Sequence, residues 1–112
     1  PVDPAINALS FIPVLKRLGR SNESYLSFAI PGWTLSIDLP AQNAEVEYVL
    51  KTIDYELAQL GGKIYLAKDS RQSAEIFKKT YKSLKTWKKQ KELLDPKGIF
   101  ISDISKRLDI YN

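Results

Sequence analysis

The spacing of the hydrophobic residues changes abruptly at Pro40, and this change constrains the fold more than any other feature. From Trp33 to Leu39 apolar and polar residues alternate strictly, which is typical of a half-buried strand. From Val46 to Leu60 apolar residues recur every three or four positions, as they do on one face of an amphipathic helix. A strand followed directly by a helix favours an α+β fold, with a small antiparallel or mixed sheet and helices on one face.

The ends of this helix are predicted by the residues that flank it. Asn43 is placed to cap its first turn, and Gly61 with Gly62 is placed to end it. The repeat predicts a buried stripe along the helix, made of the following residues: Val46, Val49, Leu50, Ile53, Leu57 and Leu60.

Further elements are predicted on both sides of the helix. Residues 10–18 contain Pro13, which favours an edge strand or an irregular extended segment. Short apolar runs predict strands over residues 26–30 and 63–68.

Two helices are expected in the remaining residues. Ser73 is placed to begin one of them, and Ser102 or Asp103 a short last one. The longer helix is expected to bury an unbroken stripe, made of Phe77, Tyr81, Leu84 and Trp87.

Several residue types are missing from the 112 residues, and their absence excludes whole classes of chemistry. There is no Cys, His or Met, so the chain offers no thiolate nucleophile, no disulfide and no Cys/His zinc site. Proton transfer would fall to Lys, Tyr, Asp or Glu, or to a cofactor. The length suits about one domain and is short for a complete cofactor enzyme. Since the first residue is Pro1, we expect a piece of a longer protein.

Positive charge gathers in the second half of the chain. The first 62 residues carry four basic and seven acidic side chains, whereas the remaining 50 carry thirteen and six. Seven lysines are expected on the solvent face of the predicted second helix: Lys78, Lys79, Lys82, Lys85, Lys88, Lys89 and Lys91. These lysines are compatible with a small nucleic-acid-binding module, but a solvated helix face is the favoured interpretation.

Two polar groups could carry chemistry. Lys68 is expected at a strand end beside Asp69, where its ammonium could meet an anionic or electron-rich ligand group or form a surface ion pair. Thr34, Ser36 and Asp38 share one face of the alternating strand, and could line a cleft or face solvent.

A different interpretation of the whole chain is a stand-alone interaction module that associates with itself through exposed strand edges.

Four segments together resemble one family. They are Phe11-Ile-Pro-Val-Leu-Lys-Arg-Leu-Gly19, Leu26-Ser-Phe-Ala-Ile-Pro-Gly-Trp-Thr-Leu-Ser-Ile-Asp-Leu-Pro40, Gly61-Gly-Lys-Ile-Tyr-Leu-Ala-Lys-Asp-Ser-Arg71 and Asp95-Pro-Lys-Gly-Ile-Phe-Ile-Ser-Asp-Ile-Ser-Lys-Arg-Leu108. Their order and spacing are similar to the C-terminal end of FAD-linked oxidoreductases of the vanillyl-alcohol-oxidase type. Within that family the likeness points to the decaprenylphosphoryl-ribose 2-oxidase branch, with aldonolactone and alditol oxidases as more distant cousins.

The resemblance implies a domain organisation. Residues 1–112 would form the C-terminal portion of a substrate domain, part of which also lies upstream. The FAD-binding domain, which holds most of the cofactor, would be absent from this chain. The isolated piece would therefore be inactive.

The resemblance also implies roles for six residues. Lys68 would be catalytic and would contact the flavin, and Tyr65 would face the flavin from the same strand. The substrate pocket would be lined by four residues: Val14, Lys16, Thr34 and Ser36. Mycobacterial-type relatives carry Asn and Cys at the last two positions, so this chain departs from them there. No metal ligand is implied.

The implied reaction is oxidation of a sugar or polyol hydroxyl, with a hydride passing from carbon to flavin N5. In the named branch the substrate is a polyprenyl-phosphate-linked ribose, and a partner reductase completes the conversion. The implied partners are thus the FAD-binding domain, a small or lipid-linked sugar and a reductase, with a homodimer possible and no nucleic acid. A cytoplasmic or membrane-associated location is expected, since neither a signal sequence nor a membrane span is recognisable.

Overall fold

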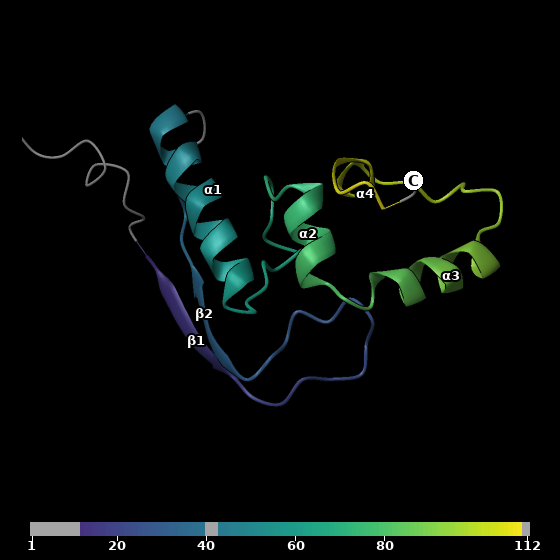
Figure 1. The fold of residues 1–112 in the computed structure, drawn as a ribbon, viewed down its shortest axis with the longest axis horizontal. Coiled ribbons are helices and arrows are strands. Elements are labelled where there is room, and N and C mark those ends of the chain that lie inside the picture. Colours follow the sequence, from purple (N-terminus) through teal and green to yellow (C-terminus); the bar gives the residue numbers. More distant parts are fainter. Residues whose placement is uncertain (1–11, 40–42, 111–112) are drawn as a thin grey trace, which may run out of the picture.

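A computed structural model describes residues 12–39 and 43–110 and confirms an α+β architecture (Figure 1). The described elements are β1 (Val14–Leu18), β2 (Gly32–Ser36), α1 (Ala44–Gln59), α2 (Ala74–Thr80), α3 (Leu84–Leu94) and α4 (Asp103–Arg107). The two strands lie at the opposite side of the structure from α3 and α4 (Figure 1). Residues 10 and 11 of the first predicted strand lie outside the described residues.

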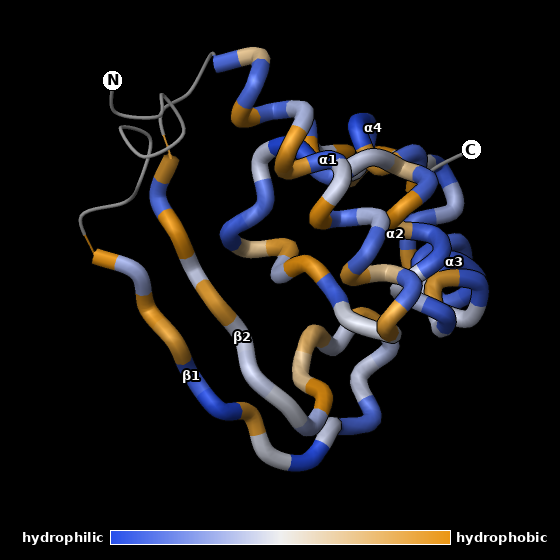
Figure 2. The backbone as a smooth tube through the Cα atoms, turned by 60° about the vertical axis from the view of Figure 1, so that its left-hand side comes forward, coloured by the Kyte–Doolittle hydropathy of each residue, from blue (hydrophilic) through white to orange (hydrophobic). Residues whose placement is uncertain are grey.

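The sheet consists of β1 and β2, which pair antiparallel. Val14 lies opposite Ser36, and Lys16 lies opposite Thr34. Since alternate residues of a strand point to opposite faces, these four share one face of the sheet. Hydrophobic residues recur along both strands (Figure 2), and the other face carries three cross-strand neighbours that are more than half exposed: Leu15, Trp33 and Leu35.

Helix α1 has the predicted ends but not the predicted burial. The Asn43 side chain accepts hydrogen bonds from the backbone N–H groups of Glu45 and Val46, and Gly61 adopts φ +79° just beyond the helix. The expectation of a buried stripe is wrong for Val49, Ile53 and Leu60, which are more than half exposed. The buried residue of α1 is instead Asp54. Helix α1 packs against α2, and the remaining stripe residues, Val46, Leu50 and Leu57, are half-buried.

Two predicted strands, residues 26–30 and 63–68, are wrong. Both segments are irregular or form turns, and in each of them a side chain binds one backbone carbonyl. The Lys63 ammonium donates to the carbonyl of Ser27 at 2.9 Å, and the Tyr81 hydroxyl donates to the carbonyl of Ile64 at 2.6 Å.

The second predicted helix begins as expected but is broken. The Ser73 hydroxyl caps α2 by accepting from the N–H of Ile76. Tyr81 then leaves the helical conformation, with φ −99° and ψ 74°, so that α3 starts anew at Leu84. The break does not disperse the predicted stripe, since the core consists of Phe77, Tyr81, Leu84, Leu108 and Ile110, with Trp87 packed against it.

The chain between α3 and α4 turns as predicted. Gly98 adopts φ +61°, and its N–H donates to the carbonyl of Asp95 at 3.0 Å. Ser102 rather than Asp103 caps α4, through a reciprocal pair of hydrogen bonds with Ser105. Helix α4 then leads into Leu108, which is fully buried in the core.

Asp95 gives this region a predicted pH dependence. The Lys91 ammonium and the N–H groups of Ile99 and Phe100 donate to its carboxylate and lower its pKa from 3.8 to about 2. A carboxylate with a depressed pKa contributes stability above its unfolded pKa, and that stability is lost as the pH falls through about 2. We expect Asp95→Asn to lower the thermal midpoint at neutral pH. Its deficit should shrink as the pH falls below about 4, and a constant deficit would contradict this assignment.

Candidate functional site

Four of the predicted site residues form a single patch, which we call the polar face of the hairpin. Val14 with Ser36 and Lys16 with Thr34 make two cross-strand pairs, two positions apart along each strand. Directly opposite side chains on antiparallel strands have Cβ atoms about 4.5–5.5 Å apart. Thr34 is half-buried and the other three are exposed. The patch therefore presents one ammonium, two hydroxyls and a small apolar side chain together.

Tyr65 and Lys68 lie on a turn, not on the strand that was predicted. The backbone N–H of Lys68 donates to the carbonyl of Tyr65 at 3.0 Å. The Tyr65 ring packs against Phe28, with centroids 4.9 Å apart, and is 47% exposed. The Lys68 side chain is exposed and has no hydrogen-bond or ion-pair partner among the described residues. No described hydrogen bond joins this turn to the polar face of the hairpin.

The alternative of a surface ion pair between Lys68 and Asp69 is wrong, because Asp69 faces inward. Its carboxylate is only 2% exposed and accepts from Arg107 Nη2 at 2.9 Å. It also accepts from the backbone N–H groups of Arg71 at 2.9 Å and Gln72 at 2.8 Å. Burial favours a raised pKa for Asp69, but these hydrogen bonds outweigh it and the pKa is lowered.

Sequence reasoning missed this network. An aspartate that binds backbone N–H groups two and three residues ahead forms an Asx-turn, for which Asp69-Ser70 was a sign. Arg107 lies 38 residues further along the chain, and no local pattern connects it to Asp69. Such a pairing becomes visible only when α4 is packed on the core.

Tyr81 holds the residues that lead into this turn. Burial, together with the nearby Asp69 and Tyr65, raises the pKa of its hydroxyl to about 12. The hydroxyl is therefore a hydrogen-bond donor to the carbonyl of Ile64 at neutral pH. Lys63 places its ammonium 5.1 Å from the centre of the Tyr81 ring.

Arg71 fixes the far end of the turn to α1. Its guanidinium makes two hydrogen bonds with the Asp54 carboxylate, at 2.5 and 2.9 Å. The Asp54 side chain is 8% exposed and that of Arg71 is 33% exposed. This ion pair therefore ties α1 to the turn at a buried position.

Because Asp54 is more deeply buried than Arg71, removing either residue should cost a different amount of stability. Arg71→Ala leaves a buried carboxylate without its partner, and we expect it to destabilise the protein by about 2 kcal/mol, since partial solvation of the arginine reduces the usual cost. Asp54→Ala leaves a guanidinium that water can reach, so its cost should be about 1 kcal/mol. Urea unfolding of both variants measures the difference. Equal costs, or the reverse order, would show that the pair is not buried as described.

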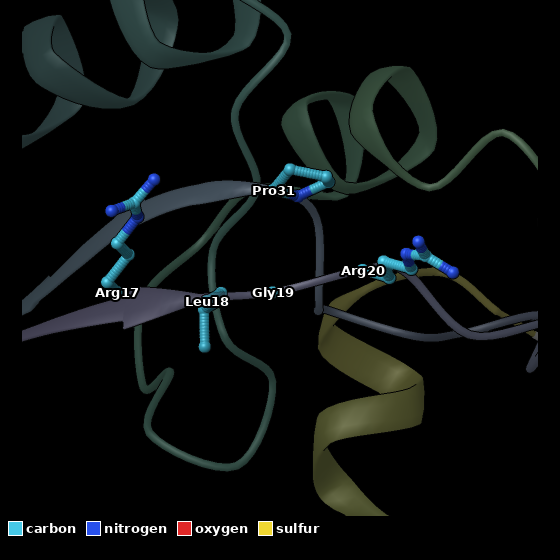
Figure 3. A pocket seen from close by; sticks show the side chains of 5 residues that line it. All are labelled: Arg17, Leu18, Gly19, Arg20 and Pro31. Carbon is cyan, nitrogen blue, oxygen red and sulfur yellow. The ribbon is translucent and has the colours of Figure 1, made fainter.

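Two shallow cavities open on the described surface, and neither contains a predicted site residue. One, of about 510 Å³, lies at the end of the hairpin and is lined by Arg17, Leu18, Gly19, Arg20 and Pro31 (Figure 3). The other, of about 610 Å³, lies between the loop that starts at Ser21 and the segments around Gly61 and Lys82.

Comparison with known proteins decides the family. Residues 7–108 match the model of the D-arabinono-1,4-lactone oxidase family. The chain belongs to this family. It is also 39% identical, over 101 residues and 90% of its length, to decaprenylphosphoryl-beta-D-ribose oxidase of Mycolicibacterium smegmatis, of which it covers 22%. An uncharacterized protein in the mprA 5' region of Streptomyces coelicolor is 36% identical over 97 residues, covering 87% of this chain and 26% of the relative.

This member of the oxidase family spans about a quarter or less of the length of those curated relatives. The resemblance found in the sequence is thereby confirmed at the level of the family and of the related decaprenylphosphoryl-ribose oxidase. Among residues 12–39 and 43–110, no cluster of acidic side chains is suited to hold a metal ion. The helices described there are also too short or too polar to cross a membrane.

The lysines of α2 and α3 make several contacts within the oxidase-family chain. Lys78 pairs with Asp109, Lys91 pairs with Asp95, and Lys79 lies 5.0 Å from the centre of the Tyr55 ring. These contacts with acidic and aromatic side chains of the same chain partly offset the positive charge of the three lysines.

Proposed function

We propose that this chain is the C-terminal portion of the substrate domain of an FAD-dependent oxidoreductase that oxidises a sugar or polyol hydroxyl. The observation that carries the proposal is the family match over residues 7–108. The geometry supports it, since Val14, Lys16, Thr34 and Ser36 share one face of the hairpin. The FAD-binding domain is proposed to lie elsewhere in the same parent protein.

The turn that carries Tyr65 and Lys68 has a donor set that fits FAD. An exposed lysine with no side-chain partner among the described residues and a half-exposed tyrosine ring lie three residues apart. When bound, FAD would supply the two-electron oxidation of the hydroxyl carbon. A cation at the N1/C2-carbonyl edge of the ring stabilises the negative charge of the reduced form. Lys68 is proposed to supply that cation and Tyr65 to flank the ring.

The polar face of the hairpin is proposed to bind the substrate. The hydroxyls of Thr34 and Ser36 can both donate to and accept from sugar hydroxyls. Lys16, which lies beside them, can bind an anionic group such as a phosphate, while Val14 offers an apolar contact. These features suit the finer proposal of a polyprenyl-phosphate-linked ribose, whose keto product a partner reductase would consume.

Exposed apolar side chains support a role within a larger protein. Leu15, Trp33 and Leu35 on the hairpin and Val49 and Ile53 on α1 are all more than half exposed. Surfaces of this kind mark interaction sites. We propose that the remainder of the parent protein covers them, in preference to a second copy of this chain.

The test is to purify the full-length protein and record its visible absorption during anaerobic additions of candidate sugars. We expect a bound flavin whose oxidised absorption is lost with the right sugar. A full-length protein that binds no flavin would overturn the proposal.

Lys16 gives a separate prediction about the substrate. In the full-length protein, Lys16→Ala should raise KM for a phosphate-linked sugar by about tenfold, the loss of one charge-assisted hydrogen bond. The kcat should change little, because the phosphate does not react. A neutral polyol should show no such rise in KM. Equal increases in KM for both substrates would show that Lys16 does not bind the phosphate.

A further inference from the structure

Lys68 and the residue after it point in opposite directions. The Lys68 side chain is exposed, whereas the Asp69 carboxylate is 2% exposed. Asp69 Oδ1 accepts from the N–H groups of Arg71 and Gln72, and this closes the chain into a turn immediately after Lys68. The backbone that carries the lysine is therefore fixed by a side chain that does not itself reach the surface.

The buried carboxylate is in turn held by the C-terminal helix. Arg107 Nη2 donates to Asp69 Oδ2 at 2.9 Å, and Nη1 donates to the carbonyl of Gln72 at 2.6 Å. Arg107 is the last residue of α4, and the next residue, Leu108, is fully buried in the core. The core thus fixes the arginine, and the arginine fixes both ends of the turn from Asp69 to Gln72.

The chain before Lys68 is anchored independently. The Tyr81 hydroxyl holds the carbonyl of Ile64, and Phe28 packs against the Tyr65 ring. Leu66, in the turn itself, is partly buried and packs against the core, so between these anchors and Asp69 only Ala67 and Lys68 are exposed. A flexible lysine stabilises a developing charge well only if its backbone is held in place beforehand.

We propose that Asp69 and Arg107 are positioning residues, which hold the turn so that the Lys68 ammonium reaches the flavin. The C-terminal helix α4 would then belong to the support of the site rather than to its lining. The inference rests on the proposed function of Lys68, and it adds the Asp69–Arg107 pair to that function.

The experiment measures the midpoint potential of the flavin in the full-length protein with FAD bound. Lys68→Ala provides the reference, with a shift to more negative potential because the reduced flavin loses its cation. Asp69→Asn keeps the shape of the side chain and an acceptor for the two N–H groups, but weakens the pairing with Arg107. We expect it to favour oxidised over reduced flavin by about tenfold, a shift of about 30 mV for two electrons.

In Asp69→Asn the sign of the shift separates positioning from direct electrostatics. Removal of the negative charge of Asp69 alone would raise the potential, whereas displacement of Lys68 lowers it. Arg107→Ala should also lower the potential, and Arg107→Lys, which keeps the charge, should restore part of it. Lys106→Ala is the matched control, because this neighbouring cation on α4 is exposed and forms a long 3.9 Å pair with Asp103.

Amide hydrogen exchange of residues 65–72 provides a readout that does not depend on the flavin. We expect faster exchange there in Asp69→Asn and Arg107→Ala, but not in Lys106→Ala. Variants that lose thermal stability while the potential and this exchange stay at wild-type values would overturn the inference. An unchanged potential in Lys68→Ala would instead overturn the proposed function of Lys68, and with it this inference.

Discussion

Lys68→Ala in the full-length protein should lower kcat by about 100-fold, the loss typical of removing one preorganised donor to a developing charge. The Lys68 side chain is exposed and has no partner among the described residues. Its removal therefore should leave the fold intact, and the unfolding midpoint should change little. Steady-state kinetics with the sugar that reduces the flavin measure the effect.

Lys85→Ala is the matched control for this prediction. Lys85 lies exposed on α3, and no contact among the described residues joins it to the turn of Lys68. Its kcat should stay at the wild-type value. A Lys68→Ala variant with the same kcat as Lys85→Ala would show that Lys68 does not act on the reacting groups.

Phe77→Ala should cost about 3–5 kcal/mol of stability, because it opens a cavity at a site that cannot collapse easily. Phe77 is fully buried and packs against Tyr81, with ring centroids 5.0 Å apart. Since Tyr81 also holds the carbonyl of Ile64, the loss should spread to the turn that carries Lys68. Urea unfolding of the full-length protein measures the cost.

Leu94→Ala serves as the control for Phe77→Ala. Leu94 is 84% exposed at the end of α3, and exposed substitutions change stability by about 0.5 kcal/mol or less. If both variants unfold at the same urea concentration, the core is not centred on Phe77 as the structure has it.

Local chemistry predicted much of the fold. The caps at Asn43, Ser73 and Ser102 and the turn at Asp95 depend on interactions within a few residues, and such interactions are visible as short patterns. The strand around Thr34 was also predicted from its alternation. The strand ends at Ser36 rather than at Leu39, because its partner β1 begins at Val14, which pairs with Ser36.

The errors arose where distant residues decide the structure. The runs at 26–30 and 63–68 have strand-like composition, but the side chains of Lys63 and Tyr81 bind their carbonyls instead. Helix α1 has a helical repeat, yet burial depends on what packs against it. Tyr81 interrupts the second predicted helix and still contributes to the core.

The candidate site residues could be proposed from the sequence, whereas the hydrogen bonds that support the turn could not. The alternation of β2 placed Thr34 and Ser36 on one face, and the family resemblance added Val14 and Lys16 opposite them. The resemblance also pointed to Tyr65 and Lys68. The Asp69–Arg107 pair spans 38 residues, so only the packed structure reveals it.

The most direct test of the account is an experimental structure of the full-length protein with FAD bound. The account predicts that Lys68 Nζ lies within hydrogen-bond reach of the N1/C2-carbonyl edge of the flavin, about 2.6–3.2 Å. It also predicts that the polar face of the hairpin, with Lys16, Thr34 and Ser36, borders the space above the ring. A flavin that lies against the opposite, apolar face of the hairpin, with Lys68 directed into solvent, would contradict it.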